Sequence, residues 1–259
     1  MFRKKHLYRF IVLCLALLTL CQSAAASAAQ GSKKENTKLY VLMYHSFVPE
    51  GTECTTWTLT DARLREDLQW LKDHGYTTVL PRELAAGDPL PEKAVMLTFD
   101  DGYEDNYTLA YPLLQEFNAK AVISLIVNHQ DNQESGWLTW DMCREMVISE
   151  LVEIGSHTYA CHKDGINRKD GESRTAYEDR VFTDLQVGTY LIEANVGRKV
   201  RFFAYPHGQT EKWASEYLKE NFAVTVTTDH GAADISGGLY DLKRCNISME
   251  TPLSKLLPA

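Results

Sequence analysis

Ala94-Val95-Met96-Leu97-Thr98-Phe99-Asp100-Asp101-Gly102-Tyr103 is the stretch from which the fold class and the chemistry of this sequence can be argued. Its first part, 94–99, is an apolar run of strand length, and a polar turn, 100–102, follows. Two adjacent acids repel each other unless a cation or a proton lies between them. A solvated turn is the alternative for the turn alone, but the apolar strand in front of it favours a functional site.

Similar apolar runs alternate with helical patterns over the rest of the chain. The predicted strands are 39–44, 94–99, 121–127, 151–154, 200–205 and 222–227, and the predicted helices are 61–74, 107–117, 141–149, 175–194 and 211–220. Such alternation indicates mostly parallel strands in an α/β fold. We find no internal repeat and no linker, so we expect a single domain.

Polar residues follow several of these predicted strands directly. They are His45, the pair Asp100-Asp101, His157 and the tripeptide 206–208. In a barrel of parallel strands, the carboxyl ends meet at one face, where active sites are built. We therefore expect these residues to lie close together, although they are far apart in the sequence.

Composition and charge restrict the class of partner. The 259 residues are 44% hydrophobic and 24% charged, which is typical of a globular protein. The formal net charge of −8 argues against nucleic acid as a partner, because phosphate binding requires a basic surface. The same charge gives little reason to bind an anionic membrane.

The N-terminus has the pattern of an export signal. Basic residues precede an apolar run, 10–20, and small residues then offer a cleavage site at Ala26-Ser27-Ala28. We expect a signal peptide at 1–28, a flexible leader at 29–38 and the folded domain at 39–259. The protein is then secreted or held at the cell surface or cell wall, with no stable membrane span after cleavage. An uncleaved anchor is the alternative.

Four cysteines remain after the predicted signal: Cys54, Cys143, Cys161 and Cys245. Outside the cell an even number permits disulfides, but four cysteines allow three pairings and the sequence does not choose among them. Free buried thiols are the alternative.

A metal site is the simplest use of His157, His162 and Asp101. Two imidazoles five residues apart can reach one ion, and a carboxylate would complete three protein ligands with one position left open, as in catalytic zinc sites. Asp100 beside them could then accept a proton from bound water. Surface or capping histidines are the alternative. Cys161 could also be a ligand, but as the neighbour of His162 we expect it to point elsewhere.

These segments resemble the motifs of a known family. Thr98-Phe99-Asp100-Asp101-Gly102-Tyr103 resembles the first motif of the polysaccharide deacetylases, the NodB-homology domain of carbohydrate esterase family four. The segment 157–162 is similar to the second motif, and Phe203-Ala204-Tyr205-Pro206-His207-Gly208 to the third. The resemblance runs from about residue 38 to 247. It implies a distorted (β/α) barrel that removes N-acetyl groups from N-acetylhexosamine polymers.

The resemblance also implies roles for the individual residues. Asp101, His157 and His162 would bind Zn²⁺ or another divalent transition metal, and Asp100 would be the general base. The backbone N–H of His207 would help to hold the oxyanion that amide hydrolysis develops.

Departures from the family pattern indicate which branch of the family this sequence resembles. The five-residue histidine spacing is similar to the branch that acts on poly-β-1,6-N-acetylglucosamine, and the usual C-terminal Leu-x-His is missing. In that branch the corresponding histidine lies at the start of the domain, so His45 is the candidate general acid; a strand-capping histidine is the alternative. Ala204 stands where many members carry an arginine that supports the base. Arg201 or Arg244 could supply that charge, with Arg244 better placed by analogy; a surface or structural arginine is the alternative for both.

Aromatic residues could line a sugar groove. Trp57 and Trp140 are candidates beside the residues named next, although Trp140 fits packing at a helix start. The expected substrate-binding residues are Tyr103, Tyr205, Pro206, Trp137 and Arg244. Glu150, Glu153 and the acid-rich stretch 170–184 are predicted to be a solvated helix face.

The leading hypothesis is a metal-dependent N-deacetylase of an N-acetylglucosamine-containing polysaccharide, either an exopolysaccharide or peptidoglycan, acting as a monomer. An O-acetyl esterase of the xylan type would use the same site. A catalytically inactive sugar-binding domain is the third hypothesis. The intact acid pair and histidines argue against it.

Overall fold

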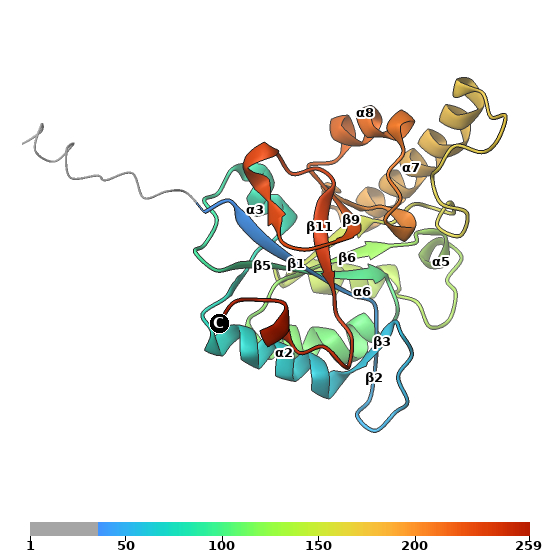
Figure 1. Cartoon of the computed structure of the whole chain (residues 1–259). Helices are drawn as coiled ribbons and strands as arrows, with labels where there is room; N and C mark the ends of the chain where they lie inside the picture. Colours follow the sequence, from blue (N-terminus) through green and yellow to red (C-terminus); the bar gives the residue numbers. More distant parts are fainter. Residues whose placement is uncertain (1–35) are drawn as a thin grey trace, which may run out of the picture. The chain divides into compact units, whose positions relative to one another are not determined.

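A closed ring of parallel strands forms the centre of the molecule in the computed structural model, which describes residues 36–259 (Figure 1). In this described part, the ring has seven strands: β1 (Lys38–Tyr44), β5 (Ala94–Asp101), β6 (Ala121–Leu125), β7 (Val152–Ser156), β8 (Phe202–Ala204), β9 (Val224–His230) and β11 (Leu242–Asn246). The predicted signal peptide and the leader up to residue 35 lie outside the described residues.

β1 closes the ring because it pairs with strands on both of its sides. It runs parallel to β5 in a register from Leu39↔Ala94 to Tyr44↔Phe99, and parallel to β11 at Leu42↔Cys245. The expected distorted (β/α) barrel is therefore confirmed. The short strands β4 (Thr77–Thr78) and β10 (Ala233–Asp234) pair with the edges of β5 and β1, and β2 (Ser46–Val48) with β3 (Thr58–Thr60) forms a separate small sheet.

Helices connect the strands and cover the outside of the barrel (Figure 1). They are α2 (Asp61–Asp73), α3 (Pro81–Ala86), the π-helical turn η1 (Asn106–Ala110), α4 (Tyr111–Phe117), α5 (Asn128–Asp131), α6 (Trp140–Ile148), α7 (Arg174–Val196) and α8 (Lys212–Asn221), with short 3-10 turns η2 (Pro206–Gly208), η3 (Ile235–Gly237) and η4 (Leu253–Lys255). Local signals set their ends. The Thr60 hydroxyl accepts the Arg63 backbone N–H at 3.1 Å and starts α2, and a left-handed Gly197 ends α7.

Strand alternation sorts the core into an inner and an outer layer. In β5, Val95, Leu97 and Phe99 belong to the cluster that also contains helix residues, so they face outward. Ala94 and Met96 belong to the other cluster, which fills the barrel. Since successive strand side chains point to opposite faces, Thr98 and Asp100 continue the inner series. The alternation therefore directs the Asp100 carboxyl into the barrel.

The structure corrects the sequence predictions in three places. β5 continues through Asp101, so the polar segment 100–102 is not a turn that starts after Phe99. β11 was not predicted at all, and neither was α3. Asn36 and Lys38, which were expected in the leader, contact the folded domain, since Lys38 pairs with Asp234 and the Asn36 amide donates to the Pro91 carbonyl at 2.6 Å.

The four cysteines are all free, with Cys143 and Cys245 buried and Cys54 and Cys161 half-buried. Among residues 36–259, no helix combines the length and the apolar character needed to cross a bilayer.

Arg63 fastens the C-terminal segment to α2. Its guanidinium donates to the carbonyls of Ser248, Met249 and Thr251 at 2.7–3.0 Å and pairs with Asp67 at 3.0 Å. Figure 1 shows this last segment, in dark red, lying across α2. Both charged side chains are buried, and burial raises the pKa of Asp67 to about 6 although Arg63 opposes that shift.

We expect Arg63→Ala to lower the free energy of unfolding by about 3–5 kcal/mol, because it leaves the buried Asp67 unpaired and frees the C-terminal segment. Arg65→Ala is the matched control, since Arg65 lies two residues away on the same helix in an exposed pair with Glu116. Urea unfolding measures both. Equal midpoints for the two variants would show that Arg63 does not fasten this segment.

Candidate active site

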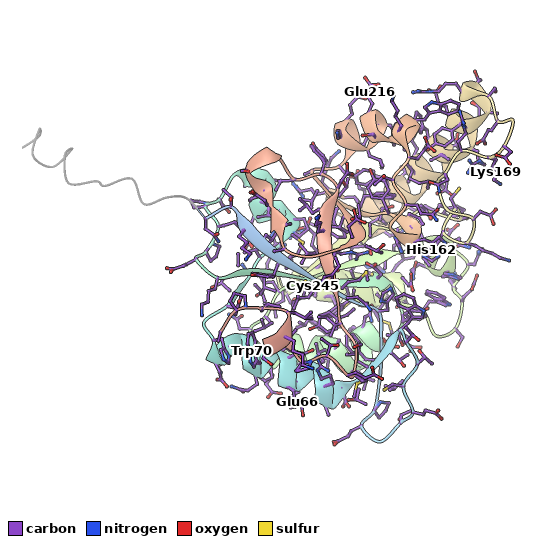
Figure 2. All side chains as sticks on the ribbon, in the orientation of Figure 1. Glu66, Trp70, His162, Lys169, Glu216 and Cys245 are labelled. Carbon is purple, nitrogen blue, oxygen red and sulfur yellow. The ribbon has the colours of Figure 1, made fainter. Side chains whose placement is uncertain are left out.

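A pocket of about 300 Å³ lies where the barrel strands end. It gathers nine of the eleven predicted site residues, from segments as distant as β1 and β11; the lining consists of Met43, His45, Trp57, Asp100, Asp101, Tyr103, His157, His162, Tyr205, His207, Thr228 and Arg244. Figure 2 shows the side chains on the ribbon and labels His162, in the loop that follows β7. The expectation that the polar strand ends converge is thus met in space.

Asp100 is held inside the barrel by Arg244. The Arg244 guanidinium lies 2.8 Å from the Asp100 carboxylate, and the Ser124 hydroxyl donates to the same carboxylate at 2.8 Å. Both Asp100 and Arg244 are only 1% exposed. Burial alone would raise the pKa of Asp100, but Arg244, with smaller contributions from His157 and His45, outweighs it and holds that pKa well below its usual range. The buried pair with Arg244 therefore favours the ionised form of the Asp100 carboxyl inside the barrel.

Asp101, His157 and His162 form a group with the geometry of a metal site. The Asp101 Oδ1 atom lies 3.6 Å from His157 Nε2 and 3.5 Å from His162 Nε2. Neighbouring ligand atoms in a tetrahedral zinc site lie roughly 3.3–3.6 Å apart. Asp101 Oδ1 is also buried without a hydrogen-bond partner among the described residues. A buried carboxylate oxygen that faces two imidazole nitrogens fits a divalent cation.

The two imidazoles are prepared as metal ligands. His157 Nδ1 lies 2.7 Å from the Ala204 carbonyl oxygen and donates its proton there, so Nε2 is the ring nitrogen that faces Asp101. Burial, together with the neighbouring His157 and His207, lowers the pKa of His162 to about 3. Protons therefore compete little for the His162 nitrogen near neutral pH.

Three residues of the site have a left-handed backbone. The φ angles are +76° at Asp101, +78° at Thr158 and +56° at His207, which is costly for residues that carry a Cβ. Thr158 is β-branched, and its buried hydroxyl has no hydrogen-bond partner in the described part of the chain. Gly208 is required for another reason, because a Cβ there would lie 2.0 Å from Thr228 Oγ1. Such strain persists only where surrounding contacts enforce it.

Asp184 on α7 supplies the contacts that hold the loop after β7 in its conformation. Its carboxylate accepts three successive backbone N–H groups, from Tyr159 at 2.8 Å, Ala160 at 2.7 Å and Cys161 at 3.0 Å. Gly188, one helical turn further on, lets the loop approach, since a Cβ there would lie 3.3 Å from the Tyr159 nitrogen. Asp184 thus holds the segment between the two histidines. The prediction of a solvated helix face is wrong at this position.

His45 is far from His157 and His162 in the sequence, but it lines the same pocket. It follows β1, and its ring centroid lies 4.7 Å from that of Trp57, which is 53% exposed. Burial lowers the pKa of His45, and the negative charges of Asp100 and Asp101 only partly offset that effect. In the free protein, His45 therefore favours its neutral form.

The predicted substrate-binding residues differ in whether they line the pocket. Tyr103 lines the pocket and stacks with Trp137 at 4.7 Å between centroids, and Trp137 stacks in turn with His129 at 3.6 Å. Burial and the nearby Asp101 raise the pKa of Tyr103 to about 12. Tyr205 lines the pocket although it is almost entirely buried, whereas Pro206 is buried in the η2 turn behind the pocket. Trp140 begins α6 and packs against the core.

The structure shows which of the two candidate arginines supports Asp100. Arg244 pairs with Asp100, whereas Arg201 lines a different pocket and does not reach the base. The sequence reasoning did not identify Ser124, Thr228 or Asp184. Ser124 lies inside a predicted strand, Thr228 just after one, and Asp184 in an acid-rich helix, so no local pattern marks them.

Comparisons with known proteins agree with this geometry. The family model described as "Polysaccharide deacetylase" matches residues 87–225. The chain is 26% identical over 282 residues to the poly-beta-1,6-N-acetyl-D-glucosamine N-deacetylase of Escherichia coli (strain K12), covering 91% of this chain and 42% of that protein. It is 30% identical to YxkH of Bacillus subtilis (strain 168), named as a polysaccharide deacetylase, covering 82% of this chain and 72% of that one.

A solved structure extends the likeness to the fold. The de-N-acetylase from Aggregatibacter actinomycetemcomitans superimposes with a TM-score of 0.73 at 30% identity, covering 84% of this chain and 97% of that one. The closed parallel barrel, with its pocket at the carboxyl ends of the strands, places the protein in the class of α/β barrels that build an active site at this face. More narrowly, the chain belongs to the polysaccharide deacetylase family.

We expect Asp184→Asn to weaken zinc binding by roughly 10–100-fold, the usual effect of losing a residue that orients metal ligands. Asparagine has one acceptor oxygen, so it cannot accept all three N–H groups. Asp179→Asn is the control, because Asp179 is exposed on the same helix. Calorimetric titration of zinc into the metal-free protein measures both. Unchanged zinc affinity in Asp184→Asn would refute a positioning role.

Proposed function

We propose that the protein is a secreted, metal-dependent N-deacetylase of a polysaccharide that contains N-acetylglucosamine. The observation that carries this proposal is the buried pair of Asp100 with Arg244, directly beside the Asp101–His157–His162 group. The names of the E. coli relative and of the superimposed structure support removal of an N-acetyl group. Secretion rests on the export signal expected at residues 1–28.

In this proposal, Asp101, His157 and His162 hold the metal ion. When bound, a divalent metal polarises the acetyl carbonyl and lowers the pKa of water toward neutrality. The low pKa of Asp100 suits a partner of this kind, because a weak base removes a proton efficiently only from an acidified water molecule. Asp100 accepts that proton at its carboxylate, and Arg244 keeps the carboxylate oriented toward the pocket.

The leaving amine requires a proton, and His45 is the candidate donor. His45 lines the same pocket from the end of β1, and Trp57 packs against its ring. Because His45 favours the neutral form in the free protein, we expect it to become protonated only as negative charge accumulates in the pocket. The backbone N–H of His207, in the strained η2 turn, is proposed to donate to the oxyanion.

The aromatic side of the pocket is proposed to hold the sugar. Tyr103, which stacks with Trp137, lines the pocket, and so does the exposed Trp57 in the loop between β2 and β3. Aromatic faces suit the apolar faces of pyranose rings. The polymer and its linkage are part of the proposal, with poly-β-1,6-N-acetylglucosamine favoured by the E. coli relative.

Acetate release by the purified protein tests this function. We expect zinc-loaded protein to release acetate from β-1,6-linked N-acetylglucosamine oligomers faster than from β-1,4-linked ones, and to release little from acetylxylan. Preferential release from acetylxylan would instead identify an esterase. No release from any of the three by zinc-loaded protein would refute the proposed reaction on these polymers.

We expect Asp100→Asn to lower kcat for acetate release by about 10²–10⁴-fold, because asparagine cannot accept the proton. Its zinc affinity should stay within a few-fold of the unchanged protein, since Asp100 is not one of the proposed ligands. Asp105→Asn is the control: Asp105 is five residues away, binds the Ser46 hydroxyl and does not line the pocket. Full activity in Asp100→Asn would sink the assignment of the base.

A further inference from the structure

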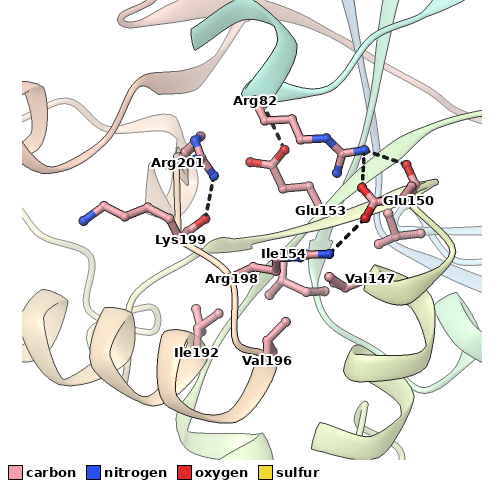
Figure 3. Close-up of a pocket in the computed structure, with 11 residues that line it drawn as sticks. Arg82, Val147, Glu150, Glu153, Ile154, Ile192, Val196, Arg198, Lys199 and Arg201 are labelled. Atoms are coloured by element: carbon pink, nitrogen blue, oxygen red, sulfur yellow. Dashed lines mark hydrogen bonds and ion pairs between the residues drawn. The ribbon is translucent and has the colours of Figure 1, made fainter. Parts of the chain in front are cut away.

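A second pocket, of about 200 Å³, opens at the other end of the barrel (Figure 3). It lies at the beginning of β7 and in the loop that leads into β8, and it shares no lining residue with the candidate active site. Its walls include aliphatic side chains from α6, β7 and α7, among them Val147, Ile154, Ile192 and Val196. Such a surface suits a hydrocarbon group.

Positive charge dominates the polar part of this pocket. Arg82 and Arg198 both pair with the one carboxylate of Glu150, at 3.0 and 2.9 Å. Lys199 lies 3.9 Å from Glu193, which is a weak pair. Arg201 donates to the Lys199 carbonyl at 3.2 Å and pairs with no carboxylate of the described residues. The pocket therefore contains unpaired positive charge, although the chain as a whole is acidic.

Glu153 adds a buried carboxyl group beside that charge. It is 5% exposed, and its Oε2 accepts the backbone N–H of Arg82 at 3.0 Å. Its Oε1 has no partner within the described part of the chain. Figure 3 shows this carboxyl group between Arg82 and Arg201. The prediction that Glu153 belongs to a solvated helix face is therefore wrong, because β7 carries it into the protein.

We propose that this pocket binds a small carboxylate that carries a branched aliphatic body. The ligand carboxylate would pair with Arg201, whose planar guanidinium matches a carboxylate with two parallel hydrogen bonds. The aliphatic body would pack on Ile154, Ile192 and Val196. A monoanion fits better than a phosphate dianion, since one unpaired arginine faces a largely apolar wall. This site goes beyond the proposed deacetylation, because it is separate from the residues that carry that reaction.

Binding of an anion here should be linked to a proton. An ionised Glu153 repels a second carboxylate, whereas a protonated Glu153 can donate a hydrogen bond to it. Burial raises the pKa of Glu153 to about 7; Arg82 and Arg201 oppose this shift, and Glu83 adds to it. Below pH 7 the proton is already present. Above pH 7 Glu153 must take up a proton from solvent when the ligand binds, so the affinity should fall about tenfold per pH unit.

Methyl NMR of the zinc-loaded protein tests the proposal with isovalerate, isovaleramide and acetate as probes. We expect isovalerate to shift the methyl signals of Ile154, Ile192 and Val196 in a saturable manner. Isovaleramide has the same body without the charge, and acetate has the charge without the body. Both should bind at least tenfold more weakly than isovalerate.

Variants assign the two polar groups. Arg201→Gln should weaken isovalerate binding at least tenfold, whereas Arg65→Gln, at an exposed arginine far from this pocket, should leave it unchanged. Glu153→Gln should abolish the loss of affinity between pH 7 and pH 9. Equal binding of isovalerate and isovaleramide to the unchanged protein would overturn the proposal without any variant. So would methyl shifts confined to residues that do not line this pocket. Acetate release from the glucosamine polymer is a separate measurement, so its failure would not bear on this pocket.

Discussion

The buried ion pair between Arg244 and Asp100 is the interaction on which the candidate active site depends. It joins β11 to β5 across 144 positions of the sequence, and both side chains are almost completely removed from water. Burying two charges costs several kcal/mol per ion unless other polar groups compensate. Here the Thr227 carbonyl and the Thr98 hydroxyl bind Arg244, and the Ser124 hydroxyl binds Asp100. Since β11 also pairs with β1 to close the ring, the charge of Asp100 can be held only when the barrel is complete.

A rigid barrel also explains how the site tolerates strained backbone. Asp101, Thr158 and His207 each adopt a left-handed conformation that costs of order 1–3 kcal/mol. Each follows or ends a parallel strand, so the sheet fixes one side of the strained residue. The other side is held by specific contacts, as in the Asp184 carboxylate that binds three successive N–H groups. Asp101 and His207 line the pocket, and Thr158 lies between His157 and His162.

Much of this arrangement could be predicted from the sequence, because it depends on local patterns. Apolar runs of strand length predicted six of the seven ring strands, and the polar residues behind them predicted the convergence of Asp100, His157 and His45. β11 was missed because Lys243, Arg244 and Asn246 interrupt its apolar pattern. The arginine that supports Asp100 could not be identified locally, since Arg201 lies in a predicted strand, Arg244 lies in the strand that was missed, and only ring closure brings Arg244 to the acid.

Acidic residues show the same limit. Glu153 and Asp184 were both predicted to lie on a solvated helix face. Instead, Glu153 is buried in strand β7, and Asp184 binds the loop that follows β7. In each case, the partner is a backbone N–H from a distant segment, Arg82 for Glu153 and residues 159–161 for Asp184. Every residue except proline has a backbone N–H, so the residue types of a sequence do not show which N–H a carboxylate will bind.

We propose that Asp101, His157 and His162 form one metal site that works together with Asp100. The most direct test follows acetate release while zinc is titrated into chelator-treated protein, with the bound zinc counted in the same samples. We expect no release without zinc, a linear rise with occupancy and a plateau at one zinc ion per chain. Full acetate release from protein that holds no metal would contradict it.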